Sequence, residues 1–347
     1  MSKAIVNINP YPFHFDTSKD LVTERGGQTR NLTLTVPNCR GRIPSLQASR
    51  LRSMVQEAHS DPSKILAHVC SYDALSSKLV EEAGFPIVFL AGYPMSSSLA
   101  LPDTGYIAFQ EVAAKIQETV RATTVPVLAD GDTGYGGPMN VRRTVSGFAQ
   151  AGAAGIMIED QTWPKRCGHT KGKSVVSRSE AYARWQAAVD ARNEGLDIWI
   201  MARTDSLIHG YEEALERARE AIRIGVDCVF VEALPDRETM ERLRHDLEFP
   251  VFANIIEGGK TENLSAKDLA TLGYSAVAYP WTLVAAKLKS IRETLEAIKG
   301  SFLVGRPPTV LSYQEVCEGV GFNTYYELEE RYQYEGSTTG SKGYQWS

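Results

Sequence analysis

Residues 156–173 combine side chains that could do chemistry with an abrupt change in composition. A short apolar run ends in Glu159, Asp160 and Gln161, the pattern of a buried strand whose carboxyl end opens into a polar site. The next segment, residues 164–173, holds four Lys or Arg residues, one Cys, one His and two Gly. Such a loop can carry a thiol and cations to an anionic substrate, although a solvated basic turn has the same composition.

A second acidic cluster lies upstream, where Asp130 and Asp132 flank a glycine at the end of another apolar run. Two carboxylates at this spacing can converge on a hard divalent cation and leave coordination positions for water and substrate. Oxygen ligands favour Mg²⁺ or Mn²⁺ over zinc. A turn with solvated aspartates is the alternative, but Glu159 and Glu232 also follow apolar runs and favour the metal site.

Arg203 follows a further apolar run and precedes Thr204 and Asp205. Its guanidinium could bind a substrate carboxylate through two parallel hydrogen bonds. It could instead be a structural arginine that bridges Asp130 or Asp205. The residues alone leave both roles open.

Cys167 is surrounded in the sequence by Lys165, Arg166 and Lys171. Because cationic neighbours lower the pKa of a thiol, we expect Cys167 to act as an acid or base near neutral pH. A zinc site would need further Cys or His residues at ligand spacing, and the nearest other cysteine is Cys228. The pattern therefore favours a reactive thiol over a zinc ligand.

Eight apolar runs, each followed by a helical stretch, must position these side chains. The runs are residues 65–70, 87–90, 125–129, 155–158, 198–201, 228–231, 251–253 and 276–278, and the clearest helices are expected at 111–122, 179–193, 211–224 and 236–245. Continuous apolar strands that alternate with amphipathic helices are typical of a parallel sheet covered by helices. Eight such units, without a Gly-x-Gly-x-x-Gly turn after the first run, predict an α/β fold of the (β/α)8 TIM-barrel type.

The barrel prediction requires functional side chains at the carboxyl ends of the strands. Polar or special residues do follow the runs in order: Gly92 and Tyr93, Asp130 and Asp132, Glu159, Arg203 and Asp205, Glu232, Asn254, and Tyr279 with Pro280. We therefore expect one site at this face of the barrel.

Composition changes divide the chain into four parts. Residues 1–44 are polar and lack a helical period, which predicts an N-terminal extension before a catalytic barrel at 45–299. Glycine and proline mark a linker near residue 305, and a C-terminal helical extension is expected at 300–335, with helices at 312–319 and 324–332. Residues 336–347 are expected to form a disordered tail.

The chain has 347 residues, of which 43% are hydrophobic and 23% are charged, and its formal net charge is −5. This balance gives no basic surface for nucleic acid. No stretch approaches the ~18 apolar residues of a membrane span, and the N-terminus lacks a secretory or transit pattern. Five cysteines without paired spacing favour reduced thiols. We expect a cytoplasmic protein that binds neither nucleic acid nor membranes.

Three motifs together carry a resemblance that spacing alone does not supply. They are Asp-Gly-Asp-Thr-Gly-Tyr-Gly at 130–136, Glu-Asp-Gln at 159–161 with Lys-Arg-Cys-Gly-His at 165–169, and Met-Ala-Arg-Thr-Asp at 201–205. From about residue 51 to 298 the chain resembles the isocitrate lyase/phosphoenolpyruvate mutase superfamily. The resemblance implies an Mg²⁺- or Mn²⁺-dependent barrel that makes or breaks a carbon–carbon bond next to a 2-oxo or 2-hydroxy acid. It also implies a homotetramer, a dimer of dimers, in which paired subunits exchange the last barrel helix.

The same resemblance implies roles for individual residues. Asp130, Asp132 and Glu159 would hold the metal, with Asp103 in support, and Ala91, Gly92, Tyr93 and Arg203 would bind the substrate carboxylate. Cys167, Gly168 and His169 would belong to a gating loop with Cys167 as the proton donor, and Glu232 and Asn254 would complete the pocket. The Lys-Arg-Cys-Gly-His loop is similar to that of the lyases rather than the mutases.

Departures from the family pattern narrow the substrate. Ala285 and Phe322 stand where the methylisocitrate lyases would place arginines for a third carboxylate. Because an unpaired buried carboxylate costs several kcal/mol, a dicarboxylate is the better candidate. The chain is most similar to the fungal-type oxaloacetate acetylhydrolases and the 2,3-dimethylmalate lyases.

Three functions follow, in order of preference. The first is hydrolysis of oxaloacetate to oxalate and acetate, and the second is cleavage of a 2-hydroxy dicarboxylate such as 2,3-dimethylmalate or a methylisocitrate-like acid. These two differ by whether water joins C2, which a side chain such as Thr282 could decide. The third is a homologue that binds dicarboxylates without turnover.

Overall fold

The computed structural model describes residues 41–301, 304–306 and 308–334. The predicted extension at 1–44 and the tail at 336–347 lie outside these residues, apart from residues 41–44, so both stay predictions. No helix in the described ranges is long and apolar enough to cross a membrane.

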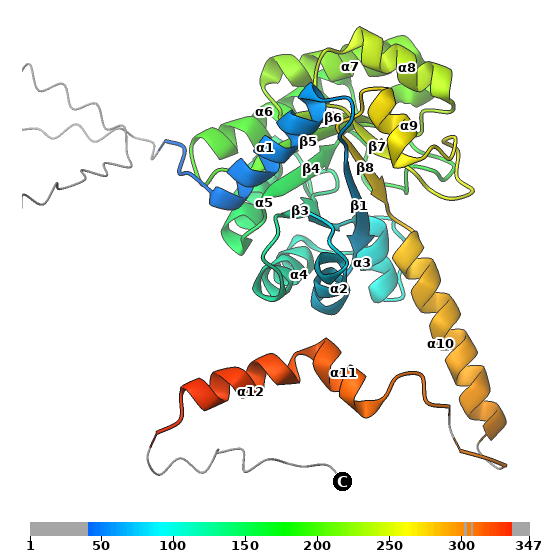
Figure 1. Cartoon of the computed structure of the whole chain (residues 1–347). Helices are drawn as coiled ribbons and strands as arrows, with labels where there is room; N and C mark the ends of the chain where they lie inside the picture. Colours follow the sequence, from blue (N-terminus) through cyan, green and yellow to red (C-terminus); the bar gives the residue numbers. More distant parts are fainter. Residues whose placement is uncertain (1–40, 302–303, 307, 335–347) are drawn as a thin grey trace, which may run out of the picture. The chain divides into compact units, whose positions relative to one another are not determined.

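Eight parallel strands form the centre of the fold (Figure 1). They are β1 Leu66–Ser71, β2 Val88–Leu90, β3 Val127–Asp130, β4 Gly155–Glu159, β5 Trp199–Thr204, β6 Cys228–Val231, β7 Phe252–Asn254 and β8 Ala276–Tyr279. The strand order is β6-β5-β4-β3-β2-β1-β8-β7, and a parallel bridge between Val229 and Val251 joins β6 to the start of β7. The predicted α/β barrel is confirmed.

Helices alternate with the strands and cover the outside of the sheet. Their bounds are α1 Leu46–Ser60, α2 Ala74–Glu82, α3 Gly92–Ser98, α4 Phe109–Ala122, α5 Pro138–Ala151, α6 Arg178–Asn193, α7 Tyr211–Ile224, α8 Arg237–Asp246, α9 Ala266–Thr271, α10 Thr282–Ser301, α11 Tyr313–Val320 and α12 Phe322–Arg331. Helix α1 precedes the first strand, and α11 and α12 follow the barrel in the sequence. The four helices expected most clearly from the sequence coincide with α4, α6, α7 and α8 to within two residues at each end.

Two apolar clusters account for the rigidity of the barrel. One lies between the strands and the helices that cover them, and the other fills the barrel interior with residues such as Leu128, Met157 and Phe252. Helix α1 packs at the amino ends of the strands, where Arg52 pairs with Asp197 at 3.1 Å and with Asp227 at 2.8 Å. The amino face is therefore closed by packing and ion pairs, which leaves the opposite face for function.

Strand β5 is longer than the sequence predicted. The apolar run suggested an end at residue 201, but the strand continues through Arg203 to Thr204. Arg203 lies in register with Glu159 of β4, so the two opposite charges face each other across neighbouring strands. Because each charge is paired within the sheet, the strand can carry a buried arginine without ending.

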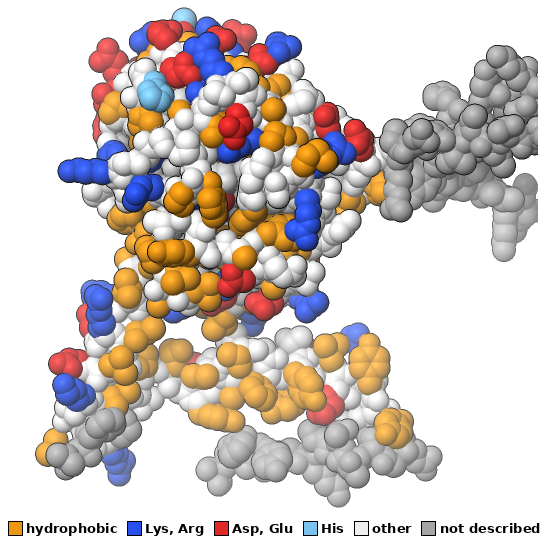
Figure 2. Space-filling view, turned by 180° about the vertical axis from the view of Figure 1, so that it is seen from behind, with side chains coloured by type: hydrophobic (Ala, Val, Ile, Leu, Met, Phe, Trp, Pro, Cys, Tyr) orange, Lys and Arg blue, Asp and Glu red, His pale blue; other side chains and the backbone are white. Residues whose placement is uncertain are grey.

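Helix α10 buries little of its own surface. Among its described residues only Val284 is buried, whereas Leu288, Ile291 and Leu295 are exposed. A groove of about 520 Å³ runs between α2 and α10 and is lined mainly by apolar side chains, including Leu75, Leu79 and Leu283. Apolar side chains are also exposed over wide parts of the molecular surface in Figure 2.

Candidate active site

A cavity of about 40 Å³ opens at the carboxyl ends of the strands. Its lining combines an acidic part, a loop part and an apolar part: Cys70, Phe89, Ala91, Gly92, Tyr93, Asp103, Asp130, Met157, Cys167, Gly168, His169, Arg203, Phe230, Glu232, Phe252, Asn254, Ile256, Pro280 and Trp281. Every residue predicted for the site lines this cavity except Asp132, Glu159 and Thr282. The prediction that strand ends converge on one site therefore agrees with the geometry.

Asp130 and Asp132 lie at the end of β3 and, with Asp103 and Glu159, form the acidic part of the site; Asp103 and Asp130 line the cavity, whereas Asp132 and Glu159 do not. The Oδ2 atom of Asp130 accepts a hydrogen bond of 2.9 Å from the backbone N–H of Gly92, and its Oδ1 accepts one of 3.0 Å from Asp132 N–H. Asp132 has a φ of 47°, a left-handed conformation that is rare outside glycine and typical of functional sites. The N–H of Glu159 donates to the Asp132 carbonyl at 2.9 Å, which joins this turn to the end of β4.

Lys165 lies inside the acidic part, which the sequence did not predict. Its ammonium pairs with Asp103 and lies 2.8 Å from Asp132 Oδ1, and its side chain is only 4% exposed. Burial raises the pKa of Asp132 to about 7, and the neighbouring Asp130 and Asp103 carboxylates act in the same direction against Lys165. A basic loop residue is thus a structural part of the carboxylate cluster.

The acidic part fits a hard cation bound with water. Glu159 Oε1 is buried without a hydrogen-bond partner, and Asp132 Oδ1 is buried beside the Lys165 ammonium, so each oxygen keeps a lone pair for a cation. No group of three or more His, Cys, Asp or Glu side chains within the described residues converges closely enough to form a complete cage. Proteins commonly bind Mg²⁺ through one or two carboxylates, with water as the remaining ligands, and oxygen ligands suit Mn²⁺ as well.

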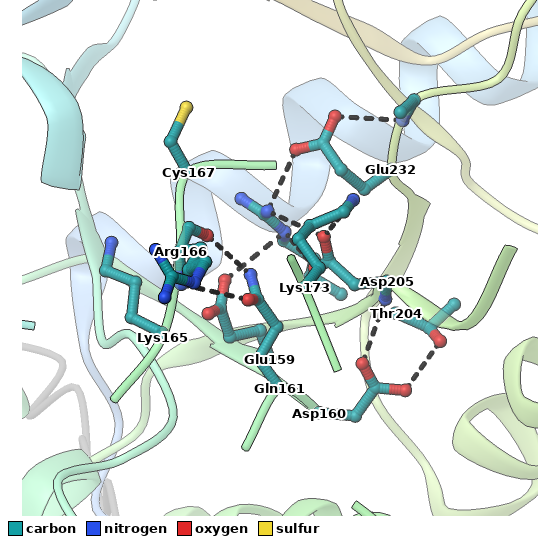
Figure 3. Close-up of polar contacts among 12 residues, drawn as sticks. Glu159, Asp160, Gln161, Lys165, Arg166, Cys167, Lys173, Thr204, Asp205 and Glu232 are labelled. Atoms are coloured by element: carbon teal, nitrogen blue, oxygen red, sulfur yellow. Dashed lines mark hydrogen bonds and ion pairs between the residues drawn. The ribbon is translucent and has the colours of Figure 1, made fainter. Parts of the chain in front are cut away.

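Arg203 forms ion pairs with three carboxylates, those of Glu159, Asp205 and Glu232. Figure 3 labels these three residues. Its Nε lies 2.9 Å from Asp205 Oδ2 and 3.3 Å from Glu159 Oε2, and its Nη2 lies 3.0 Å from Glu232 Oε2. Although burial alone would raise the pKa of Glu232, Arg203 and His169 hold it at about 2. Of the two roles left open by the sequence, the structural pairing with Asp205 is present, and the guanidinium also lines the cavity.

The loop that carries Cys167 is closed over the cavity. Backbone N–H of Lys260 donates to His169 Nδ1 at 3.0 Å, so the ring hydrogen lies on Nε2, which is 3.1 Å from Glu232 Oε1. Lys173 pairs with Asp205 at 2.6 Å. A Cβ atom on Gly168 would lie 2.3 Å from a Glu232 oxygen, so only glycine permits this closure.

The environment of Cys167 differs from the sequence-based expectation. We expected basic neighbours to lower its pKa, but burial raises the pKa of the thiol to about 11. Lys165 points into the acidic part, and the Asp103 and Glu232 carboxylates also raise the pKa of Cys167 against Arg203. Cys167 is therefore a protonated thiol at neutral pH, suited to give a proton and not to accept one.

The sequence alone could not predict where the side chains of Thr282, Trp281 and Asp160 lie. Thr282 is exposed and donates to Glu257 Oε1 at 2.6 Å, outside the cavity lining. Trp281 instead lines the cavity and stacks on Tyr93, with 5.0 Å between the ring centroids. Asp160 points away and accepts hydrogen bonds from Thr204 and Asp205. Sequence position alone does not tell which of two adjacent residues faces the barrel interior.

We expect Cys167 to react slowly with iodoacetamide at pH 7.5. A pKa raised from 9.0 to about 11 lowers the thiolate fraction roughly a hundredfold, and the thiolate is the reacting form. Peptide mass spectrometry would follow alkylation of Cys167 in the native protein and in the same chain unfolded in urea. Equal rates in the two states would contradict the assignment of a buried, protonated thiol.

Comparisons with known proteins agree with this arrangement. The family model described as phosphoenolpyruvate phosphomutase matches residues 57–299. The 2,3-dimethylmalate lyase of Eubacterium barkeri is 36% identical over 265 residues, which are 76% of this chain and 91% of that protein. A probable 2-methylisocitrate lyase of Corynebacterium glutamicum is 41% identical over 226 residues, covering 65% and 73% of the two chains.

A solved structure of oxaloacetate acetylhydrolase with the inhibitor 3,3-difluorooxalacetate superposes with a TM-score of 0.75. It is 30% identical, and the match covers 82% of this chain and 96% of that one. These relatives act on carbon–carbon bonds as lyases or hydrolases. The chain therefore belongs to the phosphoenolpyruvate mutase/isocitrate lyase superfamily and is an enzyme of its carbon–carbon lyase and hydrolase group.

Proposed function

We propose that this protein is a lyase that cleaves the C2–C3 bond of a 2-hydroxy dicarboxylate with alkyl substituents, of the 2,3-dimethylmalate type. The observation that carries the proposal is that the cavity has a polar part and an apolar part. One part holds Arg203, the carboxylates and a protonated Cys167, and the other is walled by Ile256, Trp281 and neighbouring apolar side chains. An apolar wall accommodates methyl groups and offers no cation for a third carboxylate.

Residues of the acidic part would hold Mg²⁺ or Mn²⁺. Asp130, Asp132 and Glu159 are the candidate ligands, directly or through water, because buried oxygens of Asp132 and Glu159 keep lone pairs for a cation. The bound ion would withdraw charge from the C2 oxygen and its neighbouring carboxylate. A solved structure of phosphonopyruvate hydrolase, 23% identical and similar in fold, contains oxalate and Mg²⁺.

The protein's own groups would carry the bond cleavage. Arg203 would orient the C1 carboxylate, and a carboxylate of the acidic part would accept the proton of the C2 hydroxyl. The electron pair of that O–H bond forms the C2 carbonyl as the C2–C3 bond breaks, and C3 receives a proton from the Cys167 thiol. Return of the first proton to the thiolate restores the enzyme, so 2,3-dimethylmalate gives pyruvate and propionate.

The Gly92 amide, which the family resemblance assigned to the substrate carboxylate, donates to Asp130 in this structure. It would therefore act indirectly, by orienting a metal ligand. The neighbouring backbone of Ala91 and Tyr93 remains at the cavity wall.

Oxaloacetate hydrolysis is the second candidate, supported by the similarity to oxaloacetate acetylhydrolase. This reaction needs a water molecule positioned to add to C2. Thr282 was the candidate side chain for that distinction, but its hydroxyl donates to Glu257 outside the cavity lining. The lyase is therefore the first choice, in reverse of the order that the sequence suggested.

We expect pyruvate release from 2,3-dimethylmalate with Mg²⁺, measured by coupling to lactate dehydrogenase. Asp132→Asn should lower turnover on the order of a thousandfold, because it removes charge from the metal site and keeps the shape. A parallel reaction with oxaloacetate would be analysed for oxalate and acetate by NMR. Hydrolysis of oxaloacetate alone would promote the second candidate, and unchanged turnover in Asp132→Asn would refute the metal assignment.

We also propose that the groove between α2 and α10 is covered by α10 of a second copy, in a homotetramer built from such pairs. Leu288, Ile291 and Leu295 on α10 are exposed, and Ile291 also lines the groove, so α10 and the groove together present one apolar surface that a second copy could cover. Exchange of this helix would bury this surface on both copies at once.

Ile291→Glu should shift the protein to smaller species, because it places a charge in this contact. Size-exclusion chromatography with light scattering gives the mass. Lys289→Glu, at a side chain that is 76% exposed on the same helix, is the control and should leave the mass unchanged. A monomeric wild-type protein would refute the assembly.

A further inference from the structure

Lys165 brings its charge to the acidic part of the site. The ammonium pairs with Asp103 and lies 2.8 Å from Asp132, and the side chain is 4% exposed. A Cβ atom built on Gly92 would lie 3.0 Å from both Lys165 Nζ and Asp130 Oδ2, so the ammonium and this carboxylate flank the same backbone position. Lys165 therefore neutralises the same carboxylates that are the candidate metal ligands.

The contact between Lys165 and Asp132 uses a single carboxylate oxygen. Asp132 Oδ1 lies 2.8 Å from the ammonium, and this contact lowers the pKa of Asp132 against the effect of burial. A carboxylate oxygen has two lone pairs, so this oxygen keeps one that Lys165 does not use. A divalent cation could take it, since carboxylate oxygens are preferred ligands of hard cations.

Binding both a metal ion and the Lys165 ammonium to Asp132 costs free energy. Repulsion between like charges a few Å apart is strong wherever water is excluded, and both Lys165 and Asp132 are buried. A metal ion on Asp132 therefore requires the ammonium to move away, or binds more weakly while the ammonium stays.

The far half of the loop has separate anchors. His169 contacts Glu232 and Lys173 pairs with Asp205, so neither contacts Asp103 or Asp132. The near half, which contains Trp163 and Lys165, is held by the contacts of Lys165, by two hydrogen bonds between Gln161 and Arg166, and by Trp163, whose ring occupies the space beside Gly105. Movement of Lys165 would therefore be confined to the near half and would change the surroundings of Trp163.

We propose that Lys165 is the resident counter-cation of the acidic part, and that a divalent metal ion displaces its ammonium from Asp132 into the cavity, where it can meet the substrate carboxylate. Lys165 is on this account a positioning residue that sets the metal affinity and couples metal binding to the near half of the loop. This inference rests on the metal site of the proposed function.

The test is Mn²⁺ binding without substrate, measured by the electron paramagnetic resonance signal of free Mn²⁺ at pH 8. Lys165→Met keeps the length of the side chain and removes its charge, and it should bind Mn²⁺ about tenfold more tightly than the wild type. Lys173→Met is the matched control. It removes the same charge from the same loop, but its partner is Asp205, so its affinity should stay within about twofold of the wild type.

Thermal unfolding gives a second readout. Without metal, Lys165→Met should melt below the wild type, because Asp103 and Asp132 lose their counter-cation, and Mn²⁺ should raise its Tm more than that of the wild type.

The outcomes separate the two proposals. Failure of the wild type to bind Mn²⁺ would refute the metal site itself. Wild-type binding with no gain in Lys165→Met, or an equal gain in Lys173→Met, would overturn the counter-cation role and leave the metal site standing.

Discussion

The buried charge of Arg203 is the constraint on which the rest of the site depends. Parallel pairing of β4 and β5 places Arg203 beside Glu159. Asp205, directly after β5, and Glu232, directly after β6, contact the same guanidinium. Removing these charges from water costs free energy, and only the close contacts among them offset that cost. The cluster therefore fixes the ends of three neighbouring strands relative to one another.

The loop closes because its cations complete two anionic groups. Lys173 and His169 contact carboxylates that surround Arg203, whereas Lys165 enters the cluster of Asp103 and Asp132. Each contact would be lost if the loop moved into solvent. Because Cys167, Gly168 and His169 of this loop line the cavity, we expect the loop to open when substrate enters. Contacts between charged and polar groups, rather than apolar packing, then hold the loop in its closed position.

The sequence was sufficient for the barrel and for the convergence of most of the site. Apolar runs and the polar residues that follow them report strand ends, and parallel strands bring those ends together whatever the loops do. The sequence was insufficient where a side chain's direction or solvent exposure decides its chemistry. Cys167 has basic neighbours in the chain but carboxylates and little water around it in space, so its pKa rises.

Thr282 and Trp281 show the same limit at the substrate end. They are adjacent in sequence, but the first turn of α10 directs the threonine to Glu257 and leaves the indole stacked on Tyr93 at the cavity. Under the proposed function, the residue beside the far half of the substrate would be an aromatic ring and not a hydroxyl. An aromatic wall stabilises a substrate through buried apolar area and shape, whereas a hydroxyl would hold a water molecule or a polar group. The rotation of a single helix thus bears directly on the choice between adding water at C2 and cleaving an alkyl-substituted hydroxy acid.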